Sequence, residues 1–234
     1  MIEELDFETY LFISQKELKI YLFDIKNHKN LYEKKLINKN HNQILDYNIL
    51  NSFLDDNIFE IEKLIGGFLK TISLVINDFE ITNIYLGIKK KNYEKNLDKK
   101  NLESILADAH DLFKENNQNK QIMHIIINKY LVNNVYETNF DKSKNVDSFS
   151  LEVQFITISK NFVSEINKML EKYHIKSNEW FDENYVKNFF KNNHLNISEM
   201  VYRIQTGINH KEVKIIPKNY KRVGFFERFF QLFS

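Results

Sequence analysis

Three short strand-like segments followed by a long helical pattern open the chain, and this order limits the fold more than any other feature. Residues 9–14, 17–24 and 31–38 are rich in Tyr, Phe and Ile and are separated by polar turns, which is typical of a β-meander. Residues 56–77 carry one apolar stripe at helical spacing. We predict a helix there, with a close approach to a sheet at Gly66 and Gly67.

The rest of the chain also contains both strand-like and helix-like spacings of apolar residues. Expected strands cover 82–88, 121–131, 148–159 and 175–180, and expected helices cover 98–116, 161–173, 183–192 and 198–206. Of the two long strands, 121–131 is expected to be central and 148–159 half exposed. Residues 210–223 are expected to form a tether. The fold class is therefore predicted to be α+β.

Composition and charge exclude several classes of protein. The chain has 234 residues, 43% of them hydrophobic, so it can bury a core. A formal net charge of +1 gives no global basic field, and we expect no nucleic-acid partner. The absence of cysteine excludes disulfides and thiolate metal sites. The acidic start and the lack of any apolar run of membrane-spanning length lead us to expect an intracellular protein.

No catalytic pattern stands out. The seven histidines never adopt a metal-binding spacing, and no nucleophile elbow, Walker loop or dinucleotide fingerprint is present. Gly66-Gly67 lacks the adjacent Lys-Ser or Lys-Thr of a phosphate loop. We therefore expect no catalytic residue, no metal and no cofactor, and we expect that the chain is not an enzyme.

The segment 224–234 separates completely into two faces when wound as a helix at about 100° per residue. Its apolar residues fall within an arc of roughly 160°, and basic residues precede it. This pattern favours a helix lying on an anionic lipid surface, and the alternative is a terminal helix that closes a core or a partner's groove. The membrane-binding residues are predicted to be Phe225, Phe226, Phe229, Phe230, Leu232, Phe233, Lys218, Lys221, Arg222 and Arg228.

The order of these elements and several local strings resemble the bacterial cell-division protein family FtsA, whose members are actin-like and tie the division filament to the membrane. The matching stretches are residues 64–88, 122–134, 148–175 and the tail "GFFERFFQLF". The resemblance implies a truncated actin-like first lobe at 1–88, an FtsA-type inserted subdomain at 89–180, a helical remainder at 181–209, a linker at 210–223 and a membrane-targeting helix at 224–234.

The chain departs from the family where nucleotide should bind. The family's first phosphate loop aligns with residues 11–18, where Phe12 replaces a metal-linked Asp and Ser14 replaces a Gly. The second phosphate motif is missing, and the residues after Trp180 are too few for the second lobe, which in the family completes the nucleotide cleft and contacts FtsZ. The chain is therefore expected to be a reduced FtsA that binds no ATP.

Two functions follow from the resemblance. The first is a non-enzymatic adaptor of the division septum, peripheral on the cytoplasmic face of the inner membrane, that self-associates or recruits division proteins through the inserted subdomain. The second is a nucleotide-dependent actin-like protein that links the FtsZ ring to the membrane. A soluble α+β module whose tail closes a core is a third reading. For the first function, Glu152 and Gln154 on the polar face of the strand 148–159 are the predicted partner-binding residues.

Overall fold

The computed structural model divides the chain into two compact units. The first unit comprises residues 1–81 and 158–208, and the second comprises residues 82–157 and 209–234. Helices and strands occur in both units, which confirms the α+β class. The structure describes residues 6–38, 45–77, 80–91, 99–137, 146–191 and 194–214.

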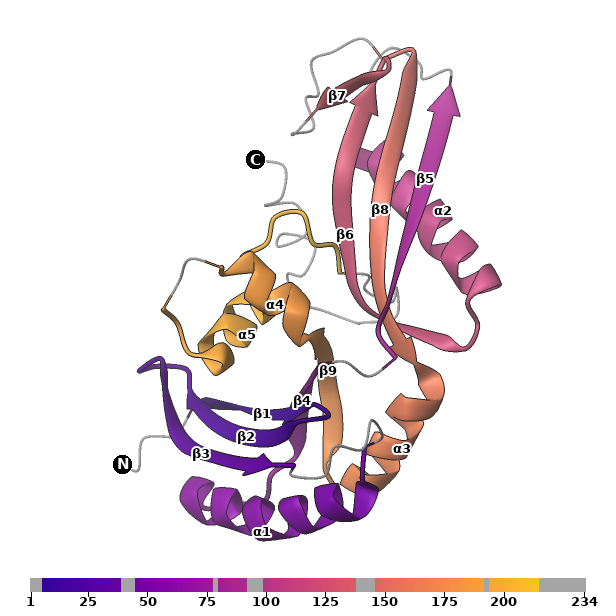
Figure 1. The fold of residues 1–234 in the computed structure, drawn as a ribbon. Helices are drawn as coiled ribbons and strands as arrows, with labels where there is room; N and C mark the ends of the chain where they lie inside the picture. The colour runs from indigo at the N-terminus through magenta and orange to yellow at the C-terminus, as the bar shows by residue number, and fades with distance from the viewer. Residues whose placement is uncertain are drawn as a thin grey trace. The chain divides into compact units, whose positions relative to one another are not determined.

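A five-stranded sheet forms the centre of the first unit (Figure 1). Its strand order is β3-β2-β1-β4-β9, with β1 antiparallel to β2, β2 antiparallel to β3, and both β1–β4 and β4–β9 parallel. Short turns join the antiparallel strands, whereas the parallel ones need longer crossovers. The strands are β1 (Phe7–Ile13), β2 (Glu17–Asp24), β3 (Lys29–Ile37), β4 (Thr71–Ile76) and β9 (Lys176–Asp182).

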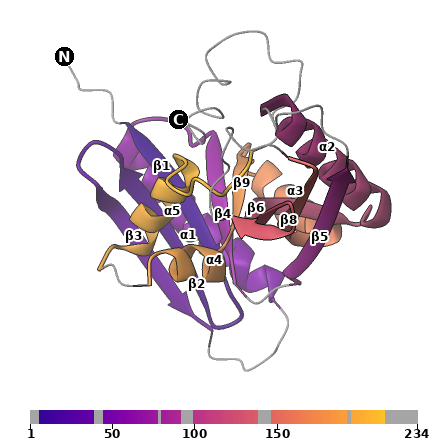
Figure 2. The same ribbon diagram turned by 90° about the horizontal axis from the view of Figure 1, so that it is seen from above.

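Helices cover both faces of this sheet. The helices α1 (Tyr47–Ile65) and α3 (Lys160–Glu171) lie on one face, and α4 (Glu183–Phe189) and α5 (Ile197–Gln205) lie across the other (Figure 2). β1 is buried on both faces, because Tyr10 packs in a cluster with Val186 and Val201 while the adjacent Leu11 is also fully buried. The near-continuous apolar sequence of β1 follows from this double burial.

The prediction of one helix over 56–77 is wrong. Asp46 caps the N-terminus of α1 by accepting hydrogen bonds from the backbone N–H groups of Asn48 and Ile49. Gly66 ends the helix in the left-handed conformation with φ +66°, and its N–H donates to the carbonyl of Glu62. The apolar residues after Gly66 belong to β4. A Cβ added at Gly66 or Gly67 would meet nothing within 4 Å, so the predicted close approach to a sheet is also wrong.

In its described residues, the second unit is a four-stranded sheet with one helix packed on it. Its strand order is β5-β8-β6-β7, and β5 pairs antiparallel with β8 along its whole length. Phe113 of the helix stacks on Phe155 of β8 with ring centroids 4.7 Å apart. The elements are β5 (Thr82–Lys91), α2 (Lys99–Asn116), β6 (Lys120–Val132), β7 (Val135–Glu137) and β8 (Ser148–Ser159).

These pairings put the boundaries between the two units at other positions than those expected from the sequence. Residues 82–88 belong to the second unit because β5 pairs with β8, and residues 160–180 belong to the first because α3 and β9 pack on the first sheet. The start of the predicted tether is also part of the second unit. The backbone N–H of Val213 donates to the carbonyl of Ile125 at 2.8 Å, and the Val213 side chain is buried in the core of that unit.

The remaining expectations for secondary structure agree with the structure to within a few residues. The alternation expected for 148–159 is present, since Phe149, Leu151, Val153 and Phe155 are fully buried and the residues between them are half exposed. Both long strands are interior to the sheet, so β8 is as central as β6. Within the described ranges, no helix combines the length and the hydropathy that crossing a bilayer requires.

The two adjacent glycines after α1 allow a matched test of this helix end. Gly66→Ala forces an L side chain into a left-handed position and should lower the free energy of unfolding by about 1 kcal/mol. Gly67→Ala, where φ lies outside that region and a Cβ meets nothing, should be neutral or slightly stabilising. Urea denaturation of both variants beside the parent measures the difference, and equal stabilities would contradict the assigned cap.

Candidate functional site

The turn between β1 and β2 stands where the family resemblance places the first phosphate loop. Ser14 donates its backbone N–H to the carbonyl of Glu17 at 3.1 Å, and its hydroxyl donates to the same carbonyl at 2.9 Å. The N–H of Glu17 donates back to the Ser14 hydroxyl at 3.0 Å. Two backbone amides that could face a phosphate are therefore bonded within the turn itself.

Phe12, at the position of the family's metal-linked Asp, is directed into the core. It is 5% exposed and meets the ring of Tyr21 edge-on with centroids 5.1 Å apart. It belongs to the buried cluster between the sheet and the helices α4 and α5. A side chain at this position is thus used for packing.

Glu17 adds a negative charge beside the turn. Burial alone would raise the pKa of its carboxyl, but hydrogen bonds and charge attraction from Lys19 and Lys35 outweigh burial and lower that pKa. The carboxylate therefore stays ionised, and it holds two ammonium groups that could otherwise attract phosphate. The charged side chains beside the turn are therefore paired with one another.

A polar network closes the carboxyl ends of the parallel strands, the place where open α/β sheets bind ligands. The amide of Asn77, after β4, donates to the Glu183 carboxylate at 2.7 Å and accepts from the Asn184 amide at 3.2 Å. Glu183 is buried and also pairs with Lys187 at 2.8 Å. Asp182 caps α4 through the backbone N–H of Asn184. These groups satisfy one another, as buried polar groups must.

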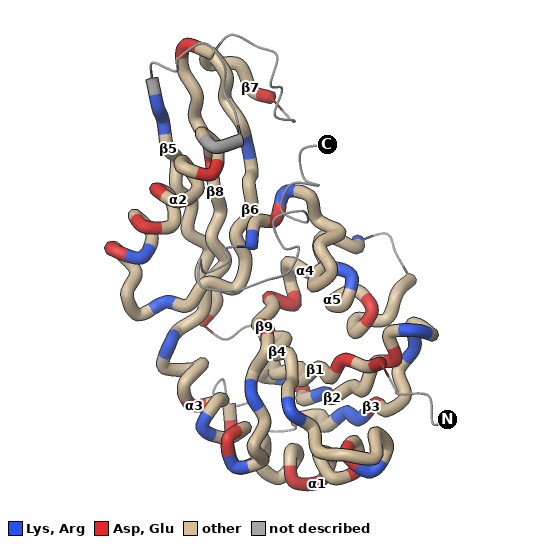
Figure 3. Tube along the Cα trace, turned by 180° about the vertical axis from the view of Figure 1, so that it is seen from behind, with Lys and Arg blue, Asp and Glu red and all other residues tan. Residues whose placement is uncertain are grey.

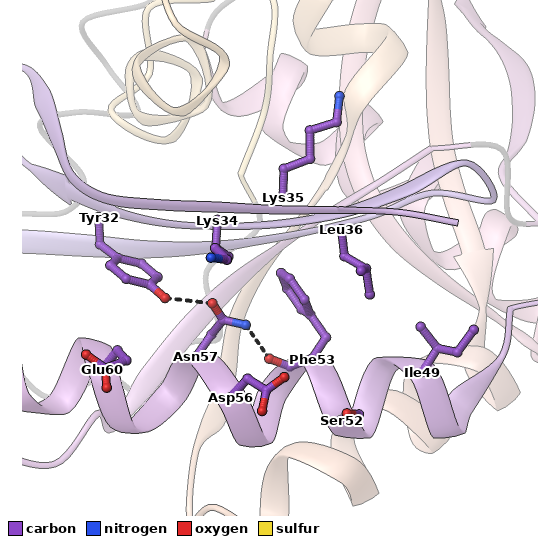
Figure 4. Close-up of a pocket in the computed structure, with 10 residues that line it drawn as sticks. All are labelled: Tyr32, Lys34, Lys35, Leu36, Ile49, Ser52, Phe53, Asp56, Asn57 and Glu60. Carbon is purple, nitrogen blue, oxygen red and sulfur yellow. Dashed lines mark hydrogen bonds between the residues drawn. The ribbon is translucent and has the colours of Figure 1, made fainter. Parts of the chain in front are cut away.

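A groove with a volume of about 520 Å³ lies between β3 and α1 (Figure 4). Tyr32 and Leu36 point from β3 toward the helix, and the Tyr32 hydroxyl donates to the Asn57 amide oxygen at 2.7 Å. Burial, with the nearby carboxylates of Glu60 and Asp56, raises the pKa of Tyr32. Among the described residues that line this groove there is no histidine and no nucleophile–base pair.

The predicted partner-binding residues lie together on the sheet face opposite α2. Glu152 accepts a hydrogen bond from Asn128 at 3.4 Å and lies 3.8 Å from the ammonium of Lys129. The amide of Gln154 donates to the side chain of Asn83 at 2.9 Å. Both residues are half exposed and belong to the interior strand β8, so they offer a face rather than a strand edge.

Sequence reasoning missed a buried pair in the second unit. The ring nitrogen Nδ1 of His124 lies 2.7 Å from a carboxylate oxygen of Glu212, and both side chains are buried. No local signal links two residues this far apart.

Across the described part of the chain, no group of three or more His, Asp or Glu could hold a metal ion. Basic and acidic residues are interspersed along the traced chain (Figure 3).

All the predicted membrane-binding residues, from Lys218 to Phe233, fall outside the described residues.

Comparison with known proteins gives similarity of fold. No protein-family model matches the chain, and no curated protein matches it in sequence. One similar solved structure is the cytoplasmic domain of EpsL, an inner membrane component of the type II secretion system of Vibrio cholerae, with 4% identity and a TM-score of 0.41 over 77% of this chain. Another is a Bacteroides thetaiotaomicron protein of unknown function with an actin-like ATPase fold, with 16% identity and a TM-score of 0.34 over 81% of this chain.

A third similar structure is the PilM–PilN complex of type IV pilus biogenesis, with 9% identity and a TM-score of 0.44 over 78% of this chain. This chain spans 59%, 58% and 49% of the three solved chains in turn. None of the three is described as an FtsA protein, and the resemblance to FtsA and to cell division is not supported by these comparisons.

Substitution to lysine tests whether the face that carries Glu152 and Gln154 binds a partner. Glu152→Lys with Gln154→Lys should change the free energy of unfolding by no more than about 1 kcal/mol, because both positions are half exposed and the lost ion pair is weak. The same change should weaken binding to a division partner or self-association. Sedimentation velocity and localisation in cells measure these effects, and a folded double variant with unaltered assembly and localisation would remove this face from consideration.

Proposed function

We propose that this chain is a membrane-associated, actin-like adaptor that brings proteins together at the division site without turning over nucleotide. Two features support the proposal. One is the β1–β2 turn, whose amides and charges are engaged within the protein. The other is the amphipathic sequence at residues 224–234.

The turn is the observation on which the non-enzymatic part rests. A polyphosphate with Mg²⁺ needs a carboxylate for the metal and backbone amides that are free to approach the phosphate. At the corresponding positions the chain places Phe12 in the core, bonds Ser14 to Glu17, and holds an ionised carboxylate at Glu17. The polar network at the ends of β4 and β9 is likewise satisfied by its own members.

The tail sequence supports membrane association. Six apolar residues on one helical face can insert into the interface, and each basic residue near an anionic leaflet contributes about 1 kcal/mol. The basic residues Lys218, Lys221 and Arg222 precede the apolar face along the chain. A short helix of this kind is marginal in water and needs an apolar surface on which to fold.

Cell division is the setting that the sequence resemblance supports. EpsL and the PilM–PilN complex belong to type II secretion and to type IV pilus biogenesis, and these are the alternative settings for an adaptor of this kind. A fluorescent fusion expressed at native level separates them. Recruitment to the septum is expected, and accumulation elsewhere on the envelope would exclude the division site.

The tail prediction concerns binding to vesicles. Phe229→Glu with Phe230→Glu places two charges on the apolar face and should release the protein from anionic vesicles, because each buried CH₂ equivalent contributes about 0.8 kcal/mol that a charge removes. The matched control is Gln231→Glu with Ser234→Glu, which adds the same charge to the polar face. Vesicle sedimentation measures both, and a double Phe variant that sediments like the parent would place the anchor elsewhere.

The nucleotide prediction concerns the whole chain. Calorimetric titration with ATP and Mg²⁺ should give no measurable heat of binding, and no phosphate should be released, because the turn offers neither the metal-linked carboxylate nor free amides. Micromolar affinity for ATP in this measurement would refute the non-enzymatic reading and favour the nucleotide-dependent one.

A further inference from the structure

β5 is an edge strand with a long accessible flank. It pairs with β8 on one side over the residues from Thr82 to Lys91. On its other side, no strand among the described residues of either unit pairs with it. An edge of this length presents a row of backbone groups that can pair with another strand.

Gly87 lies near the middle of β5, and nothing in the described part of the chain requires a glycine there. Its φ lies outside the left-handed region, so the backbone conformation does not require glycine. A Cβ at this position would meet nothing within 4 Å, so no neighbouring atom of the described residues requires glycine either. Glycine in a strand weakens it and often marks a place where another molecule approaches closely.

Tyr85, two residues earlier on the same sheet face, is 57% exposed. Its cross-strand neighbour on β8 is Gln154, and that of Gly87 is Glu152. The open face of β5 therefore places a large exposed ring beside a position with no side chain. Aromatic rings commonly cover a glycine on the neighbouring strand of a sheet.

We propose that β5 pairs antiparallel with β5 of a second copy of this chain about a two-fold axis at Leu86. In this register Tyr85 of each copy lies opposite Gly87 of the other, so each ring covers one glycine. The two four-stranded sheets then form one continuous sheet.

The sequence of β5 is self-complementary in this register. On the α2 side, Ile84 of each copy lies opposite Ile88 of the other, and both residues already pack against the core of their own unit. On the open face, Lys89 lies opposite Asn83, which keeps like charges apart. Shifting the axis to Tyr85 places the two tyrosines opposite each other and leaves each Gly87 against Asn83. Shifting it to Gly87 puts the glycines together and Tyr85 against Lys89.

This interface goes beyond the proposed adaptor function and does not depend on it, since neither the lipid tail nor nucleotide takes part. It also differs from the Glu152–Gln154 face, because it uses the backbone of β5. The expected contact is small and belongs to the weak, transient class.

Cysteine cross-linking tests the register directly, because the natural chain has no cysteine. Full-length Asn83→Cys mixed with full-length Lys89→Cys should give a disulfide-linked heterodimer, since directly opposite Cβ atoms lie about 5 Å apart. Either variant alone should not cross-link, because like positions lie about 20 Å apart along the strands. Association through the tail would not produce this selectivity, and equal cross-linking in all three samples, or none in the mixture, would overturn the proposal.

Sedimentation velocity over a concentration series tests the roles of the two side chains. Gly87→Thr should raise the dissociation constant of the dimer at least about tenfold while leaving the thermal midpoint unchanged or higher, because threonine favours strands and has free space there. Tyr85→Ser should weaken the dimer as well. The control, Ser150→Thr, makes a similar change on the interior strand β8 and should leave the dimer intact. A parent protein that stays monomeric, or a Gly87→Thr variant that dimerises normally, would overturn the proposal.

Discussion

The parallel pairing of β4 with β9 is the constraint on which the rest of the structure depends. It joins Leu74 to Trp180 and Ile76 to Asp182, across about a hundred residues of chain. Parallel neighbours cannot be joined by a tight turn, so the chain must leave the first sheet after β4 and return before β9. Residues 82–157 of the second unit, followed by α3, occupy that crossover. Most of an independently cored unit is thus inserted at one connection, and only its last strand-like segment, around Val213, arrives from the end of the described chain.

The same pairing determines the chemistry of the sheet's carboxyl edge. Because β4 and β9 end side by side, Asn77 and Glu183 become neighbours and bond at 2.7 Å. Asp182 and Asn184 complete a network in which each side chain has a partner within the protein. The usual ligand-binding edge of such a sheet is here used to stabilise the start of α4.

Local sequence signals predicted most elements but not their partners. Alternation and aromatic content located β1, β2, β5 and β8 closely, because those patterns depend on burial within a single strand. The helix predicted at 56–77 failed because an apolar stripe at helical spacing continued through Ile72 and Ile76, and Gly66 was not recognised as a left-handed cap. The expected domain boundaries differ from those of the structure because strand pairing is long-range. Nothing in the sequence of residues 82–88 indicates that this strand pairs with β8.

For the candidate site, too, the sequence predicted the features that depend on one local stretch and not those that depend on folding. The replacement of an expected Asp by Phe12 was visible in the sequence, since it depends on one aligned stretch. The turn's hydrogen bonds, the Asn77–Glu183 contact and the buried His124–Glu212 pair were not, since each is a product of folding between distant or turn residues. Gly87 was visible as a glycine in a strand, but its significance depends on the empty space around its Cα, which only the folded sheet reveals.

Under the proposed membrane role of residues 224–234, pairing through β5 would strengthen attachment to a lipid surface. A single short amphipathic helix binds a bilayer weakly and reversibly, and stable attachment usually takes two membrane signals. A dimer carries two such tails, so that after one inserts, the second does so at a high effective concentration and the overall affinity rises without any new contact. Weak strand pairing and weak lipid binding then reinforce each other. By linkage, the membrane that gathers the tails also favours the dimer. A protein of the proposed kind would therefore assemble where its copies are concentrated and would disperse elsewhere.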